Sequence, residues 1–131
     1  MTFTRRRLLV VVLISFWTRA RLRALTGPHP EPRPGITAAR VPAAADLTHK
    51  GAGRVFDQVR QIPRMVDGIR CHCGCAEAPD NYSLLSCFEG PAAMAQHCLV
   101  CQGQARAVFR LSREGKSLAE IRAAIDEEFG G

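Results

Sequence analysis

Sulfur side chains are concentrated in one short stretch of this 131-residue chain, between residues 71 and 101. Cys71, Cys73 and Cys75 alternate with other residues. An extended backbone would therefore direct their thiols to one side. Gly74 would let the segment bend so that the three sulfurs converge. Thiols gathered in this way could bind a thiophilic metal ion or form disulfides.

A second pair of cysteines stands on a predicted helix. Cys98 and Cys101 are three residues apart, a spacing that places two side chains on the same helical face. Cys87 lies between this pair and the first group, while His72 and His97 add imidazole nitrogens beside the sulfurs. The candidate metal ligands are therefore Cys71, Cys73, Cys75, Cys87, Cys98, Cys101, His97 and His72.

The composition of this ligand set indicates which metal it would take. Thiolates select soft ions such as Cu(I) and Zn(II), whereas Mg and Ca prefer oxygen ligands. One four-coordinate zinc needs fewer sulfurs than six. Cu(I) is therefore the favoured ion and Zn(II) the alternative, since the spacing matches no ferredoxin pattern. The expected function is to bind, buffer or transfer the metal, with a donor or acceptor protein as the partner.

Two other functions are compatible with the same cysteines. A small exported domain with an even number of cysteines is often stapled by disulfides. The staples would pair each of Cys71, Cys73 and Cys75 with one of the three later cysteines, and one bridge beside a smaller metal site is a further alternative. Thiol–disulfide exchange through Cys98 and Cys101 is the only enzymatic hypothesis. It is disfavoured because Cys98 is expected well inside a helix, away from the N-terminus that would activate it.

The elements that must position these side chains are predicted to be helical. Apolar residues at three- and four-residue steps predict helices over about residues 53–66, 91–113 and 117–129. A long loop over residues 67–90, rich in turn-forming residues, holds four of the cysteines. Ser117 and Glu120 form a capping box that opens the last helix. We therefore expect an all-α, three-helix domain with a long cysteine-bearing loop between the first and second helices. The predicted buried positions are Val55, Phe56, Val59, Ile62, Val66, Met94, Ala105, Val108, Phe109, Leu118, Ile121, Ile125 and Phe129.

The N-terminal part has a different composition. Residues 1–23 combine adjacent arginines with a short apolar run, as in an export signal of the twin-arginine type or a short N-terminal anchor. Residues 24–50 are rich in proline and alanine and poor in large apolar residues, which predicts a disordered tether. The folded domain is then expected over residues 51–131. Periplasmic or other extracytoplasmic localisation follows, with membrane contact only through the N-terminal segment, which would tether the protein if it is not cleaved.

The net charge of +6 does not indicate nucleic-acid binding. Residues 1–40 carry eight arginines and one glutamate, a net charge of +7. From residue 41 onward, ten basic and eleven acidic residues leave a net charge of −1. The folded part therefore lacks the basic surface that nucleic-acid binding requires.

The cysteine-bearing sequence resembles the exported bacterial proteins and lipoproteins that are named for a PCYCGC motif. The resemblance begins at Arg70-Cys71-His72-Cys73-Gly74-Cys75 and covers about residues 53–129. It continues through Tyr82-Ser83-Leu84, Cys87-Phe88, Cys98-Leu99-Val100-Cys101, Gly115-Lys116-Ser117-Leu118, Glu120-Ile121-Arg122 and Ile125-Asp126. The resemblance implies an exported protein whose six cysteines act as one set.

Three departures from this pattern limit what the resemblance implies. Arg70 stands where proline is usual and His72 where tyrosine is usual, which leaves the sulfurs intact and adds a candidate ligand. A cysteine that could accept a lipid is missing from the N-terminal region. The resemblance therefore does not imply a lipid anchor for this chain.

Overall fold

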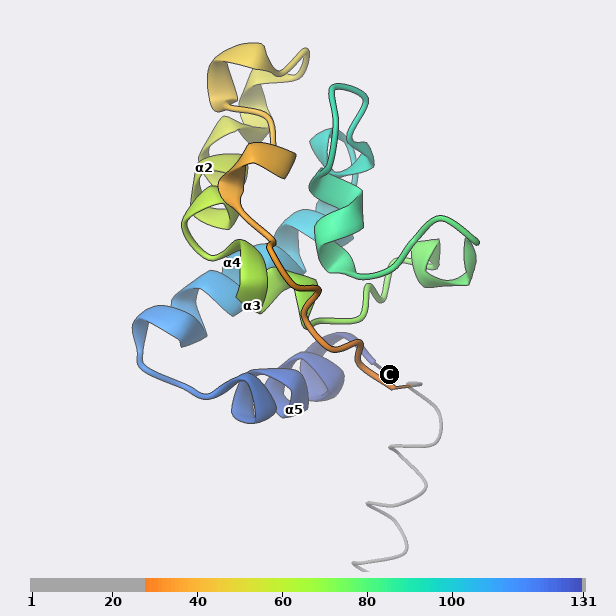
Figure 1. The fold of residues 1–131 in the computed structure, drawn as a ribbon, viewed down its shortest axis with the longest axis vertical. Helices are drawn as coiled ribbons and strands as arrows, with labels where there is room; N and C mark the ends of the chain where they lie inside the picture. The colour runs from red at the N-terminus through yellow and green to blue at the C-terminus, as the bar shows by residue number, and fades with distance from the viewer. Residues whose placement is uncertain (1–27, 131) are drawn as a thin grey trace, which may run out of the picture.

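The computed structural model describes residues 28–130 and is all-helical, with no strand in that range (Figure 1). Four α-helices carry the fold: α2 (Gly53–Gln61), α3 (Pro63–Asp67), α4 (Leu99–Arg113) and α5 (Leu118–Phe129). The connecting segments form short 3-10 helices: η1 (Ala38–Arg40), η2 (Ala44–Asp46), η3 (Lys50–Ala52), η4 (Cys75–Glu77), η5 (Leu84–Phe88) and η6 (Met94–Gln96). This confirms the predicted all-α class with a cysteine-bearing loop. The predicted export signal, residues 1–23, lies outside the described residues.

The predicted first helix consists of two helices, α2 and α3, that meet at Ile62. Pro63 begins α3, because a proline has no N–H to continue the preceding helix. The buried face is nevertheless the predicted one: Val55, Phe56, Val59 and Val66 are all inaccessible to solvent.

The predicted second helix starts later than the sequence indicated. Residues 91–98 form turns, and α4 begins at Leu99 with Cys98 as its N-cap. Buried glutamines stabilise these turns: the Gln96 amide donates to the Pro91 carbonyl at 3.0 Å, and the Gln102 amide donates to the Ala95 carbonyl at 2.8 Å. The expectation that Cys98 lies inside a helix was therefore wrong.

The last helix agrees with its prediction in both position and cap. The Ser117 hydroxyl accepts a hydrogen bond from the Glu120 amide at 3.2 Å, and the Glu120 carboxylate accepts one from the Ser117 amide at 2.7 Å. This reciprocal pair satisfies amide groups that the first turn of a helix would otherwise leave unpaired. Ile121 and Ile125 then face the core.

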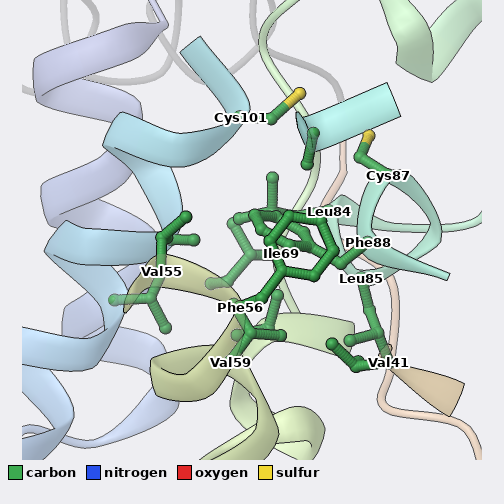
Figure 2. Close-up of a cluster of buried hydrophobic side chains, with 14 of the residues drawn as sticks. Val41, Val55, Phe56, Val59, Ile69, Leu84, Leu85, Cys87, Phe88 and Cys101 are labelled. Atoms are coloured by element: carbon green, nitrogen blue, oxygen red, sulfur yellow. The ribbon is translucent and has the colours of Figure 1, made fainter. Parts of the chain in front are cut away.

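α4 packs against both α2 and α5 and so occupies the middle of the fold (Figure 1). The core beside it contains Phe56 and Phe88, whose ring centroids are 4.9 Å apart. Figure 2 shows the side chains of Cys87 and Cys101 at one end of this apolar cluster, with their sulfur atoms directed away from the phenyl rings. Loop and helix cysteines thus meet where the apolar core ends.

The segment that we expected to be a disordered tether, residues 24–50, is folded from residue 28 onward, and the domain therefore begins well before residue 51. Ile36, Val41 and Leu47 are almost completely buried in the core. Arg60 donates hydrogen bonds to the carbonyls of Ala38 and Val41, which holds the segment against α2. The average apolar content of the segment is low, but these three residues are spaced so that each reaches the core.

An ion pair also anchors this segment. The guanidinium of Arg33 contacts the carboxylate of Asp67 at 2.7 Å, and the Arg33 amide donates to the same carboxylate at 2.7 Å. The Asp67 side chain is completely buried and also accepts a hydrogen bond from the Ser83 hydroxyl. These hydrogen bonds join the N-terminal segment, α3 and the cysteine-bearing loop at one point.

None of the helices in residues 28–130 has the length and apolar composition needed to cross a membrane.

Candidate metal centre

The first three cysteines lie on a loop that leaves the core at Ile69. The Leu84 amide donates to the Ile69 carbonyl at 2.7 Å, which fixes the start of the loop against η5. Gly74 has a φ of 91°, a conformation that residues with a Cβ rarely adopt. This turn brings the alternating thiols back toward α4, as the sequence predicted.

Five sulfur atoms converge at the centre formed by this loop, η5 and α4. The Sγ atoms of Cys71, Cys73, Cys75, Cys87 and Cys101 all lie within 4.8 Å of one another. The Cys71 sulfur is 3.2 Å from that of Cys73 and 3.6 Å from those of Cys87 and Cys101. The sulfurs of Cys73 and Cys101 are 3.4 Å apart. This group is called the cysteine cluster below.

The cysteine cluster extends from the core to the surface. Cys71, Cys87 and Cys101 are each at most 2% exposed, whereas Cys73 and Cys75 are partly exposed. The buried thiols come from three different elements, so their spacing is fixed by the tertiary fold. The outer two belong to the turn at Gly74.

Cys73 and Cys75 are joined by a disulfide, while Cys71, Cys87, Cys98 and Cys101 are free. The pairing expected for a stapled domain, loop cysteines bridged to the later ones, was therefore wrong. The turn at Gly74 brings the two sulfurs of the CxC unit together. In this oxidised form, the cysteine cluster contains three free thiols, those of the buried residues Cys71, Cys87 and Cys101.

The buried thiols shift one another's pKa values. Hydrogen bonds from Cys101 and Cys71 lower the pKa of Cys87 to about 4 and outweigh the opposing effect of burial. The Asn81 side-chain amide, 3.3 Å from the Cys87 sulfur, acts in the same direction. The Cys101 hydrogen bond lowers the pKa of Cys71, but the contact with Cys87 and burial outweigh it and raise that pKa to about 11. Hydrogen bonds with Cys71 and Cys87, together with burial, raise the pKa of Cys101. The contacts among the three thiols therefore lower the pKa of Cys87 and raise those of Cys71 and Cys101.

Cys98 lies beside the cysteine cluster but outside it. Its sulfur accepts a hydrogen bond from the Cys101 amide at 3.5 Å, which makes Cys98 the cap of α4. His97 is exposed, and its ring packs against that of His49 with centroids 5.1 Å apart. Neither residue belongs to the group of sulfurs within 4.8 Å of one another.

His72 faces a second cluster of polar side chains. Its Nε2 atom is 3.2 Å from a carboxylate oxygen of Asp126, and the same oxygen accepts from His29 Nε2 at 2.9 Å. The three side chains lie close enough to share a metal ion. However, His29 Nδ1 accepts a hydrogen bond from the Arg70 amide at 2.9 Å, so the proton of a neutral imidazole lies on Nε2. His29 therefore links the backbone of the loop to Asp126 on α5, whereas the buried Nε2 of His72 makes no hydrogen bond within the described part of the chain.

Gln104 is a site residue that sequence reasoning missed. Its side chain is completely buried on α4, and its carbonyl oxygen accepts from the His72 amide at 3.1 Å. The Gln104 amide donates to the Arg70 carbonyl at 3.3 Å, so Gln104 binds the backbone on both sides of Cys71. One signal was present in the sequence: a glutamine three residues after Cys101 falls on an otherwise apolar helical face.

The fold and the site together define a small all-helical protein with a sulfur cluster compatible with metal binding. A family model described as a protein of unknown function with PCYCGC motif matches residues 36–131. The chain therefore belongs to the PCYCGC family, as its cysteine pattern predicted. The match also includes much of the segment that was expected to be a tether. No curated protein and no solved structure matches the chain.

Proposed function

We propose that this protein binds a soft metal ion outside the cytoplasm and passes it to a partner protein, with Cu(I) favoured over Zn(II). The observation that carries the proposal is the convergence of five cysteine sulfurs within 4.8 Å of one another. Ligand sulfurs about 2.3 Å from a tetrahedral metal would stand about 3.8 Å apart. The separations of 3.2–3.6 Å around Cys71 are close to that value.

The ligand chemistry supports a soft ion. The group consists of cysteines alone, without the carboxylate oxygens that hard cations require. Its five sulfurs exceed the four ligands of one tetrahedral zinc, whereas Cu(I) is a soft ion suited to several thiolates. Cys87, whose pKa is lowered, would be the first ligand for an incoming cation.

The disulfide gives the site two ligand sets. With Cys73 and Cys75 bridged, the three buried thiols are available. Reduction by two electrons and two protons opens the bridge and adds two partly exposed thiols. We therefore expect tighter metal binding by the reduced protein.

The affinity for the metal should also depend on pH. Cys71 and Cys101 must lose their protons to bind a metal. Because their pKa values are raised, the affinity should increase with pH.

A titration of the full chain tests this function. Under anaerobic conditions, the fully reduced protein should bind Cu(I) against a competing chelator, and the affinity should fall as the pH is lowered from 8 to about 5. The protein with Cys73 and Cys75 oxidised should bind more weakly at every pH. If the reduced protein fails to compete for Cu(I) and also for Zn(II), metal binding is refuted.

Substitution of Gln104 should weaken binding without removing a sulfur. In Gln104→Leu, the backbone on both sides of Cys71 loses its hydrogen-bonding partner, so the loop is held less well against α4. Residues that orient metal ligands in this way contribute about 10–100-fold to affinity, and we expect a loss of Cu(I) affinity in that range. Gln58→Leu is the control, because Gln58 is a half-buried glutamine on α2 whose side-chain oxygen has no hydrogen-bond partner among the described residues. Equal losses in both variants would contradict a positioning role for Gln104.

Thiol–disulfide exchange is a second candidate function, favoured by one observation. The Cys73–Cys75 bridge lies beside free thiols, with Cys71 3.2 Å and Cys101 3.4 Å from the Cys73 sulfur. Attack by a neighbouring thiolate could open the bridge. The raised pKa values of both thiols oppose this reaction. Turnover in an insulin-reduction assay would support exchange.

A further inference from the structure

Met94 carries a sixth sulfur atom to the exposed edge of the cysteine cluster. Its Sδ lies 2.9 Å from the Sγ of Cys75. The side chain is 51% exposed, so the expectation that Met94 is a core residue was wrong. A half-exposed methionine contributes little to the core, yet the sulfur of this one is directed to the partly exposed end of the cluster. This arrangement indicates a role in binding.

The backbone fixes Met94 in η6, the turn that precedes α4. The carbonyl of Met94 accepts hydrogen bonds from the amides of His97 and Cys98, at 3.0 and 3.2 Å. Cys98 caps the helix that carries Cys101, so the same turn positions Met94 and a buried cysteine. The contact between Met94 and Cys75 therefore joins two ordered segments, the turn at Gly74 and the η6 turn before α4.

Sulfur exposure increases from one end of this arrangement to the other. The thiols of Cys71, Cys87 and Cys101 are buried, Cys75 is partly exposed, and Met94 is the most exposed. An ion that leaves the buried thiols toward solvent on this side would meet Cys75 and Met94 last. The apolar side chains of Leu99 and Val100, on the first turn of α4, are also exposed, at 78% and 42%.

A thioether also discriminates between the two candidate metals. It is a soft, neutral ligand that needs no deprotonation and suits Cu(I), whereas zinc sites in proteins use thiolate, imidazole and carboxylate ligands. We propose that Met94 is a further metal ligand that acts with Cys75 at the exposed edge of the cluster and makes the site selective for Cu(I) over Zn(II). This inference rests on the proposed function and specifies its metal.

The test compares Met94→Leu with the wild-type full chain, both reduced and kept anaerobic. Leucine keeps the size and apolar character of the side chain but removes the sulfur. Loss of one ligand should weaken Cu(I) binding at least about 10-fold in competition with a chelator, and Zn(II) affinity should change less than twofold. Met65→Leu is the matched control: Met65 lies on α3, half-buried against the core, and is not expected to affect either metal.

A spectroscopic measurement distinguishes ligation from a packing effect. With the methionine methyl groups labelled with ¹³C, one equivalent of Cu(I) should shift the Met94 resonance and leave that of Met65 in place, while Zn(II) should shift neither. Unchanged Cu(I) affinity in Met94→Leu, or equal loss of Cu(I) and Zn(II), would overturn this inference but leave metal binding by the cysteines intact. A wild-type protein that binds neither ion would overturn both proposals.

Discussion

Cys101→Ser is expected to lose more than about 100-fold in Cu(I) affinity, a larger loss than that of Gln104→Leu, because removing a ligand should weaken binding more than removing its supporting residue. Cys101 comes from the central helix α4 and lies 3.6 Å from the sulfur of Cys71 and 3.4 Å from that of Cys73. It thus joins the buried and the outer parts of the cysteine cluster. A hydroxyl in its place preserves the approximate size of the side chain but is a poor ligand for a soft ion.

Cys98→Ser provides the matched control for this substitution. Cys98 precedes Cys101 by three residues and caps the same helix instead of joining the cluster. Serine is itself a favourable cap, so the helix should keep its start. We expect Cys98→Ser to retain wild-type Cu(I) affinity, measured by chelator competition on protein whose helical content has been verified by circular dichroism. Equal losses in the two variants would show that the distinction between Cys98 and the other five cysteines is wrong.

Arg33→Met is expected to lower the free energy of unfolding by about 3 kcal/mol, a typical cost for removing one partner of a buried ion pair. Methionine keeps much of the apolar stem of the arginine but leaves the completely buried carboxylate of Asp67 without its counterion. The same substitution removes the contact between Arg33 and Glu89 at 2.7 Å. Denaturant unfolding monitored by circular dichroism measures the change.

The effect of this substitution should depend on pH in a defined direction. Burial alone would raise the pKa of Asp67, but the hydrogen bonds from Arg33 and Ser83 outweigh it and hold that pKa below its ordinary value of 3.8. A carboxyl with a lowered pKa stabilises the fold above its ordinary pKa, and this stability is lost as the pH falls through the lowered value. The difference between wild type and Arg33→Met should therefore be largest near neutral pH and shrink below pH 3.8.

Arg40→Met is the control for this prediction. Arg40 is on the same N-terminal segment and contacts Glu89 at 3.4 Å, but its side chain is 49% exposed. An exposed pair of this kind contributes no more than about 1 kcal/mol. If Arg33→Met lowers the free energy of unfolding by no more than Arg40→Met does, the buried ion pair does not anchor the N-terminal segment.

Local sequence patterns predicted the helices better than the segments between them. The capping box of Ser117 and Glu120 and the apolar faces of α2 and α5 depend on residues within one or two turns, so their spacing was sufficient. The start of α4 depends on Gln96 and Gln102, whose side chains bond the backbone of the preceding turns. Helical periodicity does not report such bonds, and the prediction therefore extended the helix back to Pro91.

The folded N-terminal segment was missed for a related reason. Its average composition resembles that of a disordered chain, but Ile36, Val41 and Leu47 each find a place in the core. The partner of Arg33 is 34 residues further along the chain, a contact that no local pattern reveals. Averaging over the segment therefore concealed the few residues that attach it to the domain.

The sequence predicted the sulfur ligands of the candidate site better than it predicted the residues that support them. The alternation of Cys71, Cys73 and Cys75 with a glycine turn indicated convergence, and the structure brings these thiols to Cys101. Whether a histidine next to a cysteine in the sequence also lies next to the cysteine cluster depends on which distant residues pack against it. His72 faces Asp126 because α5 packs beside the loop, and His97 turns to His49 on the N-terminal segment.

X-ray absorption at the copper edge would identify the atoms that bind the metal. The full chain, reduced and loaded anaerobically with one equivalent of Cu(I), should show a first shell of sulfur atoms at about 2.3 Å. The number of these sulfurs should fall in Cys101→Ser. A first shell of nitrogen or oxygen atoms, or no copper retained by the reduced protein, would contradict the proposal that the cysteine cluster binds a soft metal.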